Sequence, residues 1–160
     1  MMNESAVFGG GCFWCTEAVF KMLKSVTSVQ PGYAGGAPED ANYERVSSGH
    51  TKQVEVVRVE YDGEQVPYRT LLTIFFASHD ATQVDGQGND IGPQYRSVIF
   101  TTTPKQAEEA RAFIDELDAS DRSGDPIVTT VESLVEFFPA ENYHQDYYAK
   151  NQNQGYCQII

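Results

Sequence analysis

The sequence contains no long apolar run, and its first residues carry no basic stretch followed by an apolar one. A secretory signal peptide requires that pair of regions, and a membrane-spanning helix requires about 20 predominantly apolar residues. From these two absences we expect a cytoplasmic protein with no signal peptide and no membrane segment.

Basic residues are scarce: 11 Lys and Arg stand against 23 Asp and Glu, for a formal net charge of −12. Nucleic-acid binding needs clustered Lys and Arg, so we expect no nucleic-acid partner. The chain has 160 residues, of which 41% are hydrophobic, and this is enough to bury the core of one domain. We expect a monomer with a single domain over residues 1–160 and a mobile C-terminal tail from about residue 150.

Cysteine and histidine are also few. The three cysteines are an odd number in a chain with no export signal, which argues against a structural disulfide framework. His50, His79 and His144 lie far apart, and none stands at zinc-finger spacing from a cysteine pair. We therefore expect no metal and no cofactor, and catalysis, redox exchange or burial remain as uses for the cysteines.

The apolar pattern alternates between strand-like and helix-like segments. Because the helices are few and the loops are long, it favours a two-layer α/β (α+β) sandwich over a doubly wound sheet. Pro31 and Gly32 break one of the strand candidates. The expected strands are 5–8, 26–33, 52–61, 95–102, 127–131 and 134–138; the expected helices are 13–24, 67–78, 103–117 and 140–150; a single turn is expected at 42–48 and a loop at 79–92.

The segment Gly10–Cys15, Gly-Gly-Cys-Phe-Trp-Cys, lies where the first strand gives way to the first helix. Free N–H groups and the helix dipole at such a junction favour a thiolate, so we expect Cys12 to have a lowered pKa and to act as a nucleophile. Phe13 and Trp14 would form a pocket for a small apolar group. The alternative is a buried cysteine that caps a helix inside an aromatic core.

Glu55 shares one face of its predicted strand with Val57, Val59 and Tyr61, because side chains alternate along a strand. If Glu55 were buried among them, its pKa would rise, and the protonated carboxyl could serve as a general acid. The pattern alone slightly favours the other interpretation, in which Glu55 lies in water at the end of the strand.

Weaker candidates lie elsewhere in the chain. In the loop 87–97, Asp90 could orient a partner and Tyr95 could donate a hydrogen bond, although Asn, Asp and Gly are also ordinary turn formers. Tyr43 is a lone aromatic residue with a hydroxyl donor. Cys157, in a Gly-containing tail, could reach a distant thiol or could be a bystander.

Taken together, these segments resemble the A-type peptide methionine sulfoxide reductases over nearly the whole chain. The match rests on five motifs that occur in the family's order. They are Gly11-Cys12-Phe13-Trp14, Tyr43-Glu44-Arg45-Val46-Ser47-Ser48-Gly49, Glu55 to Val59, Gln87 to Ser97, and the tail elements Tyr143 to Tyr147 and Gly155 to Cys157.

The resemblance implies a mixed sheet with helices around a ferredoxin-like core. It implies reduction of the S-epimer of methionine sulfoxide, free or in proteins, with thioredoxin as the recycling reductant. It also implies the following roles: Cys12 as nucleophile, Glu55 as proton donor, Tyr43 and Tyr95 as donors to the sulfoxide oxygen, Asp90 as their support, Phe13 and Trp14 around the S-methyl group, and Cys157 as the resolving thiol, with Cys15 as the alternative.

The chain departs from the common family pattern in three places. Lys52-Gln53-Val54 replaces Gly-His-Ala, Pro93 replaces Thr, and the C-terminal region has one cysteine where some members have two. Two rival functions remain open. One is a general thiol–disulfide oxidoreductase that uses Cys12 and Cys15 as a C-x-x-C pair, and the other is a non-catalytic module that binds oxidised or Met-rich peptides.

Overall fold

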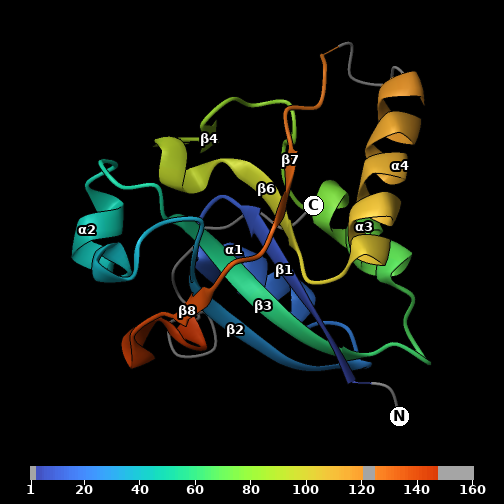
Figure 1. The fold of residues 1–160 in the computed structure, drawn as a ribbon, viewed down its shortest axis with the longest axis horizontal. Helices are drawn as coiled ribbons and strands as arrows, with labels where there is room; N and C mark the ends of the chain where they lie inside the picture. Colours follow the sequence, from blue (N-terminus) through green and yellow to red (C-terminus); the bar gives the residue numbers. More distant parts are fainter. Residues whose placement is uncertain (1–2, 121–124, 148–160) are drawn as a thin grey trace.

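The computed structural model describes residues 3–120 and 125–147 (Figure 1). The strands are β1 (Asn3–Gly10), β2 (Val26–Ala34), β3 (Val54–Asp62), β4 (Gly86–Gln87), β5 (Asp90–Ile91), β6 (Ser97–Thr101), β7 (Thr130–Ser133) and β8 (Phe137–Pro139). The α-helices are α1 (Phe13–Phe20), α2 (Tyr43–Ser47), α3 (Tyr68–Ala77) and α4 (Pro104–Ser120), and 3₁₀ turns cover Pro38–Asp40, Pro93–Tyr95 and Asn142–His144.

The main sheet has six strands in the order β7-β6-β1-β3-β2-β8. All neighbouring strands are antiparallel except β6 and β7, which are parallel. The sheet is therefore mixed, as expected. The strands β4 and β5 form a separate hairpin. Because β3 lies between β1 and β2, these two strands shield its side chains from solvent along both edges.

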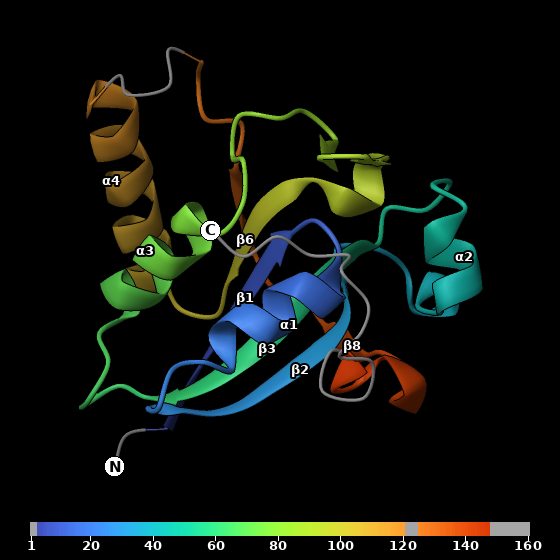
Figure 2. The same ribbon diagram turned by 180° about the vertical axis from the view of Figure 1, so that it is seen from behind.

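Helices α1, α3 and α4 cover one face of the sheet, and α1 lies in front of the strands in Figure 2. Alternate residues of β3 point toward these helices, and Val57, Val59 and Tyr61 belong to the apolar core between the layers. Phe8 of β1 stacks on Phe20 of α1 with ring centroids 5.1 Å apart. This arrangement confirms the predicted two-layer sandwich and the predicted face of β3.

The opposite face of the sheet carries a smaller apolar cluster, which includes Val7, Val56 and Phe100. Leu134 and Phe137, from the segment around β7 and β8, pack against it. Val54 and Val56 of β3 also belong to this cluster, so this end of the strand has an apolar environment on its second face as well.

Helix α1 is shorter than the predicted helix 13–24. Met22 N–H and Leu23 N–H donate to carbonyls three residues earlier, at Val19 and Phe20, and this tightens the last turn. Met22 is consequently 64% exposed, whereas its four-residue spacing from Ala18 predicted a place on the apolar face.

The predicted final helix 140–150 is wrong over residues 140–146, because among its described residues only Tyr147 is α-helical. Its first part is the 3₁₀ turn Asn142–His144, and Asp146 has a φ of 57°, outside the helical region. The predicted break in the second strand is also wrong, because β2 continues through Pro31. The Pro31 carbonyl accepts a hydrogen bond from Ala140 N–H at 2.9 Å. No helix within residues 3–120 and 125–147 is both long and apolar enough to cross a membrane.

Candidate active site

Cys12 lies at the junction of β1 and α1, as the sequence predicted. Gly11 has a φ of 96°, a backbone conformation that favours glycine, and this residue turns the chain from the strand into the helix. Cys12 is the N-cap residue, and its carbonyl accepts from Cys15 N–H at 3.1 Å and from Thr16 N–H at 3.3 Å. Its side chain is a free thiol and is 9% exposed.

The expected lowering of the Cys12 pKa is wrong for this structure. Burial, followed by the charge of Glu55, raises the pKa of the Cys12 thiol to about 12. The N–H groups of Trp14 and Cys15 lower it, as expected of a helix start, but they do not offset the loss of hydration. The start of the helix therefore lowers the pKa of Cys12 as predicted, but desolvation raises it by more and decides the direction of the shift.

Glu55 is buried, with 2% of its surface exposed. Its Oε1 accepts a hydrogen bond from Phe13 N–H at 3.2 Å, so the carboxyl lies against the first turn of α1, beside Cys12. Burial raises the pKa of Glu55 to about 8, despite that hydrogen bond. The interpretation that placed Glu55 in water is wrong, because β1 and β2 flank β3 and α1 covers it.

Tyr43, Tyr95 and Asp90 come from separate segments and gather around Cys12 and Glu55. Burial, followed by the charge of Glu55, raises the pKa values of Tyr43 and Tyr95. Cys12 and Asp90 also act electrostatically on both phenols. The structure thus brings together all five polar groups predicted for this site within the described residues.

Tyr43 is the first residue of α2, and contacts on both sides hold its backbone in place. Asn42 caps the helix through its Oδ1, which accepts from Arg45 N–H at 2.9 Å, and the Arg45 guanidinium contacts Asp40. On the other side, the Tyr43 N–H donates to Glu141 Oε2 at 2.9 Å. The backbone that carries the Tyr43 phenol is therefore tied both to its own loop and to the segment after β8.

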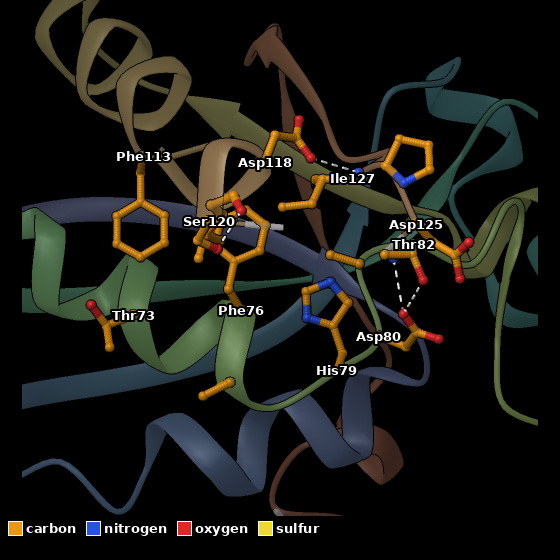
Figure 3. Close-up of a pocket in the computed structure, with 14 residues that line it drawn as sticks. Thr73, Phe76, His79, Asp80, Thr82, Phe113, Asp118, Ser120, Asp125 and Ile127 are labelled. Atoms are coloured by element: carbon orange, nitrogen blue, oxygen red, sulfur yellow. Dashed lines mark hydrogen bonds between the residues drawn. The ribbon is translucent and has the colours of Figure 1, made fainter. Parts of the chain in front are cut away.

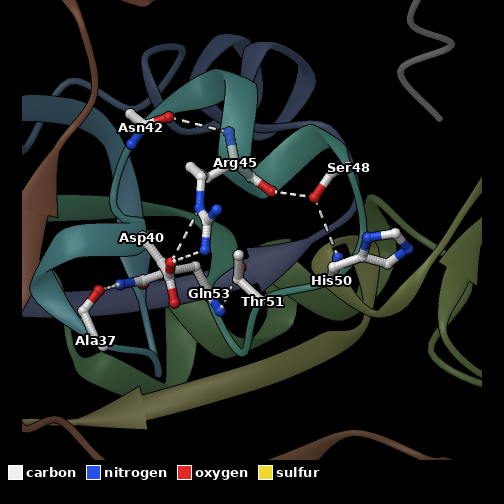
Figure 4. Close-up of polar contacts among 8 residues, drawn as sticks. All are labelled: Ala37, Asp40, Asn42, Arg45, Ser48, His50, Thr51 and Gln53. Carbon is white, nitrogen blue, oxygen red and sulfur yellow. Dashed lines mark hydrogen bonds and ion pairs between the residues drawn. The ribbon is translucent and has the colours of Figure 1, made fainter.

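Gln53, in the segment that departs from the family pattern, is 1% exposed. Its Nε2 donates to the Ala37 carbonyl at 2.8 Å. This side chain therefore braces the loop before α2 (Figure 4).

Asp90 lies on the hairpin of β4 and β5, where it pairs with Gln87. The hairpin turn is held by the Gln83 side chain, whose Oε1 accepts from Gly88 N–H at 2.8 Å. Tyr95 follows in the 3₁₀ turn Pro93–Tyr95, and Pro93 occupies its first position. Proline suits that position, because it lacks an N–H and an N–H of any other residue there would have no partner within the turn.

The aromatic pair after Cys12 is held by residues to which the sequence analysis assigned no role. Trp14 Nε1 donates to His144 Nδ1 at 2.9 Å, and the indole stacks on Tyr147 with ring centroids 3.7 Å apart. The Phe13 ring is 5.0 Å from that of His144 and 5.6 Å from that of Tyr33. The motif Tyr143–Tyr147 was the signal for His144 and Tyr147, and no sequence signal pointed to Tyr33.

Cys15 is disulfide-bonded while Cys12 is free, so these two cysteines do not form the disulfide of a C-x-x-C redox pair. Cys15 is half-buried on α1. Cys157, the predicted resolving thiol, and the predicted mobile tail lie outside the described residues.

A cavity of about 740 Å³ lies between α3, α4 and the segment after residue 125 (Figure 3). Its walls include Phe76, His79, Phe113 and Ile127. None of the predicted site residues within the described parts of the chain lines it, so it is separate from the cluster around Cys12.

Three comparisons place this chain among known proteins. The family profile described as peptide methionine sulfoxide reductase matches residues 4–160. The chain is 50% identical to the peptide methionine sulfoxide reductase MsrA of Haloquadratum walsbyi over 158 residues, which is 99% of this chain and 90% of the relative.

Among solved structures, Mxr1 from Saccharomyces cerevisiae in reduced form has a TM-score of 0.91 at 31% identity and covers 98% of this chain and 92% of its own. A structure of Mxr1 in complex with Trx2 has a TM-score of 0.63 at 23% identity, covers 91% and 84%, and shares the fold. The profile match and the 50% identity agree with the geometry of the site: this chain belongs to the peptide methionine sulfoxide reductase family.

Proposed function

We propose that this chain reduces the S-epimer of methionine sulfoxide, free or within proteins, with Cys12 as the nucleophile and Glu55 as the proton donor. The observation that carries the proposal is the environment of Glu55, which is 2% exposed, bonded to Phe13 N–H and raised in pKa to about 8. A carboxyl that holds its proton at neutral pH beside a thiol can supply the acid that a sulfoxide oxygen needs in order to leave.

The chemical step uses both groups. Cys12 Sγ attacks the sulfoxide sulfur while Glu55 donates a proton to the oxygen. The attack forms a bond between Cys12 Sγ and the substrate sulfur. The protonated oxygen then transfers to Sγ as both the substrate S–O bond and this S–S bond break, which leaves a sulfenic acid on Cys12 and releases methionine as the thioether. The thiol proton that Cys12 gives up restores the protonated Glu55, so a thiol and a sulfoxide yield a sulfenic acid and a thioether.

Tyr43 and Tyr95 donate hydrogen bonds to the sulfoxide oxygen in this proposal. Burial raises both phenol pKa values, so both hydroxyls keep their protons at neutral pH and remain donors. Asp90 supports the network from its hairpin. Phe13 and Trp14 enclose the S-methyl group, and the contacts of Trp14 with His144 and Tyr147 keep the indole in one orientation.

Recycling requires a second thiol, which condenses with the sulfenic acid to form a disulfide and release water. We propose Cys157 for this step, with Cys15 as the alternative. The disulfide at Cys15 supports a redox role for Cys15 within the same exchange. Thioredoxin would then reduce the final disulfide, and the complex of the yeast relative Mxr1 with Trx2 supports a reductant of this kind.

The proposed activity is tested with racemic N-acetyl-methionine sulfoxide and dithiothreitol, followed by chiral separation of the remaining epimers. We expect loss of the S-epimer alone, and no loss of either epimer with Cys12→Ser. If neither epimer declines although the Cys12 thiol is titratable, the catalytic proposal is wrong. A binding module for oxidised peptides would then fit better, and such a module should keep its affinity in Cys12→Ser.

The resolving thiol is tested by turnover with thioredoxin in place of dithiothreitol. Cys157→Ser should stop turnover after the first equivalent of methionine. The opposite pattern, with Cys15→Ser blocked and Cys157→Ser active, would assign resolution to Cys15.

A further inference from the structure

His79 follows α3 and touches none of the groups in the proposed chemical step. Its Nδ1 lies 2.6 Å from the Phe75 carbonyl oxygen, and its Nε2 lies 2.8 Å from Ser97 Oγ. The imidazole also packs on the Phe75 ring at 4.2 Å. An imidazole held at both nitrogens and on one face has a single orientation.

The partners of His79 define its tautomer. A carbonyl oxygen can only accept, so Nδ1 carries the proton, and in the neutral ring Nε2 then accepts from the Ser97 hydroxyl. Ser97 Oγ lies 2.7 Å from Thr129 Oγ1, which becomes the donor to it. The result is one directed chain of hydrogen bonds from Thr129 through Ser97 and His79 to Phe75. Burial lowers the pKa of His79, which favours the neutral ring.

The His79 ring forms the wall behind the turn that carries Cys12. A Cβ placed on Gly10 would lie 3.2 Å from His79 Cγ, so the ring contacts the backbone directly at this glycine. Gly10 also pairs with Ser97 across β1 and β6. The imidazole and its hydroxyl partner therefore define the position of Gly10, two residues before Cys12.

The neighbour of His79 connects the same point to the Asp90 hairpin. Asp80 N–H donates to Gln87 Oε1 at 2.7 Å, and Gln87 Nε2 donates to the Asp80 carbonyl at 2.9 Å. Gln87 pairs with Asp90 in the hairpin and lies against Gly11, where an added Cβ would be 2.8 Å from its own Cβ.

We propose that His79, as a neutral imidazole with its proton on Nδ1, is a positioning residue that fixes the Cys12 turn relative to the Asp90 hairpin. On the side of α4, the ring borders the cavity of about 740 Å³ (Figure 3). Gly10 and Ser97 thus contact the ring on the side of the site, and the cavity lies on its other side. The inference rests on the proposed sulfoxide reduction.

The test compares Ser97→Ala, His79→Phe and the double variant. Each single change breaks the chain of hydrogen bonds, and Ser97→Ala does so with the smallest change in volume. Because small misplacements of reacting groups are costly, we expect kcat for N-acetyl-methionine S-sulfoxide to fall about 10-fold with KM within about twofold. The double variant should be no slower than His79→Phe, because both changes break one linkage.

Matched controls separate positioning from general destabilisation. Thr129→Val removes the hydroxyl at nearly constant shape and should lower kcat, whereas Thr129→Ser keeps the hydroxyl and should restore it. His50→Phe replaces an exposed histidine and should leave kcat unchanged. A kcat within about twofold of the parent in folded Ser97→Ala and His79→Phe overturns the inference, and so does an equal loss in Thr129→Val and Thr129→Ser.

A second measurement does not depend on sulfoxide turnover. The rate at which iodoacetamide alkylates Cys12 reports the geometry of its turn, and it should change in His79→Phe and Ser97→Ala but not in His50→Phe. If the parent protein reduces no sulfoxide and the alkylation rates still differ, the proposed function fails and the positioning inference stands. If sulfoxide is reduced and neither kcat nor alkylation responds, only the inference fails.

Discussion

The indole of Trp14 donates a hydrogen bond to Nδ1 of His144, 130 residues further along the chain, at 2.9 Å. Trp14 belongs to the first turn of α1, and His144 to the 3₁₀ turn after β8. The acceptor is 1% exposed, so water does not replace it readily. The aromatic wall beside Cys12 is therefore built from both ends of the chain.

We expect His144→Phe to weaken substrate binding more than chemistry. Phenylalanine keeps a ring beside Phe13 but leaves the Trp14 N–H without its acceptor. KM for N-acetyl-methionine sulfoxide should rise about 5- to 30-fold, equivalent to about 1–2 kcal/mol, with kcat within about threefold. Because Trp14 is the single tryptophan, the fluorescence emission of the protein reports on this indole, and its wavelength should shift in His144→Phe. His50→Phe is the control, and an unchanged KM and emission in His144→Phe would contradict the prediction.

The activity should decline as pH rises through the pKa of Glu55. Burial holds that pKa at about 8, so the acid form is present at neutral pH and is lost above about pH 8. Glu55→Gln should lower kcat about 100-fold or more, the range of a lost general acid, and should remove this limb of the pH profile. Steady-state kinetics between pH 6 and about 10 would check it. A profile in Glu55→Gln that matches the parent would assign the proton donor elsewhere.

The same group makes folding stability depend on pH. The pKa of Glu55 is raised on folding from 4.5 to about 8, so the native state binds more protons than the unfolded state in that interval. The free energy of unfolding should then fall as pH rises, by about 1.4 kcal/mol per pH unit at most. Urea unfolding of Glu55→Gln should show a weaker decline, while the exposed Glu136→Gln should follow the parent. A parallel decline in both variants would contradict this linkage.

Asp90→Asn should make Cys12 more reactive in the absence of substrate. The Asp90 charge raises the pKa of Cys12, and its removal should lower that pKa. Alkylation by iodoacetamide at fixed mildly alkaline pH should accelerate about twofold or more, because a fall of about 0.3 unit doubles the thiolate fraction. Asp85→Asn, an exposed change in the same loop, should leave the rate unaltered. A slower reaction in Asp90→Asn would mean that Asp90 acts on Cys12 mainly through structure.

Salt should stabilise the protein. With a net charge of −12, like charges repel one another in the folded state. The screening length shortens from about 30 Å at 0.01 M salt to about 8 Å at 0.15 M. The Tm in thermal unfolding should therefore rise over this range of sodium chloride, with an uncharged osmolyte of equal osmolality as the control. An unchanged or falling Tm would show that the acidic side chains lie too far apart to repel strongly.

The sequence alone located much of the chemistry. A cysteine after glycines and before an aromatic pair pointed to the β1–α1 junction, because glycine is required where the chain turns sharply and the first helical turn offers free N–H groups. The alternation of β3 placed Glu55 on one face with Val57, Val59 and Tyr61, and the apolar pattern located α3 and α4. These are local properties, and a few neighbouring residues are enough to specify them.

The tertiary structure decided the direction of the pKa shifts of these groups and the residues that they contact. Whether Glu55 is exposed to solvent or buried depends on the strands that flank β3 and on α1, which covers it. No residue near Glu55 in the sequence indicates that these elements pack there. Likewise the helix end lowers the pKa of Cys12 while burial raises it, and burial is the larger effect. A single sequence shows the first of these effects and hides the second.

The partners of the site residues also come from distant segments. His144, Tyr147 and Glu141 lie about a hundred residues or more from the groups that they contact. His79 reaches the Cys12 turn through its contact with Gly10 and through Ser97, which pairs with Gly10 across β1 and β6. Sequence determined which residues carry the proposed chemistry, since reactivity belongs to residue type and local backbone. Tertiary structure alone decided their hydration, charge environment and orientation, because these depend on long-range packing.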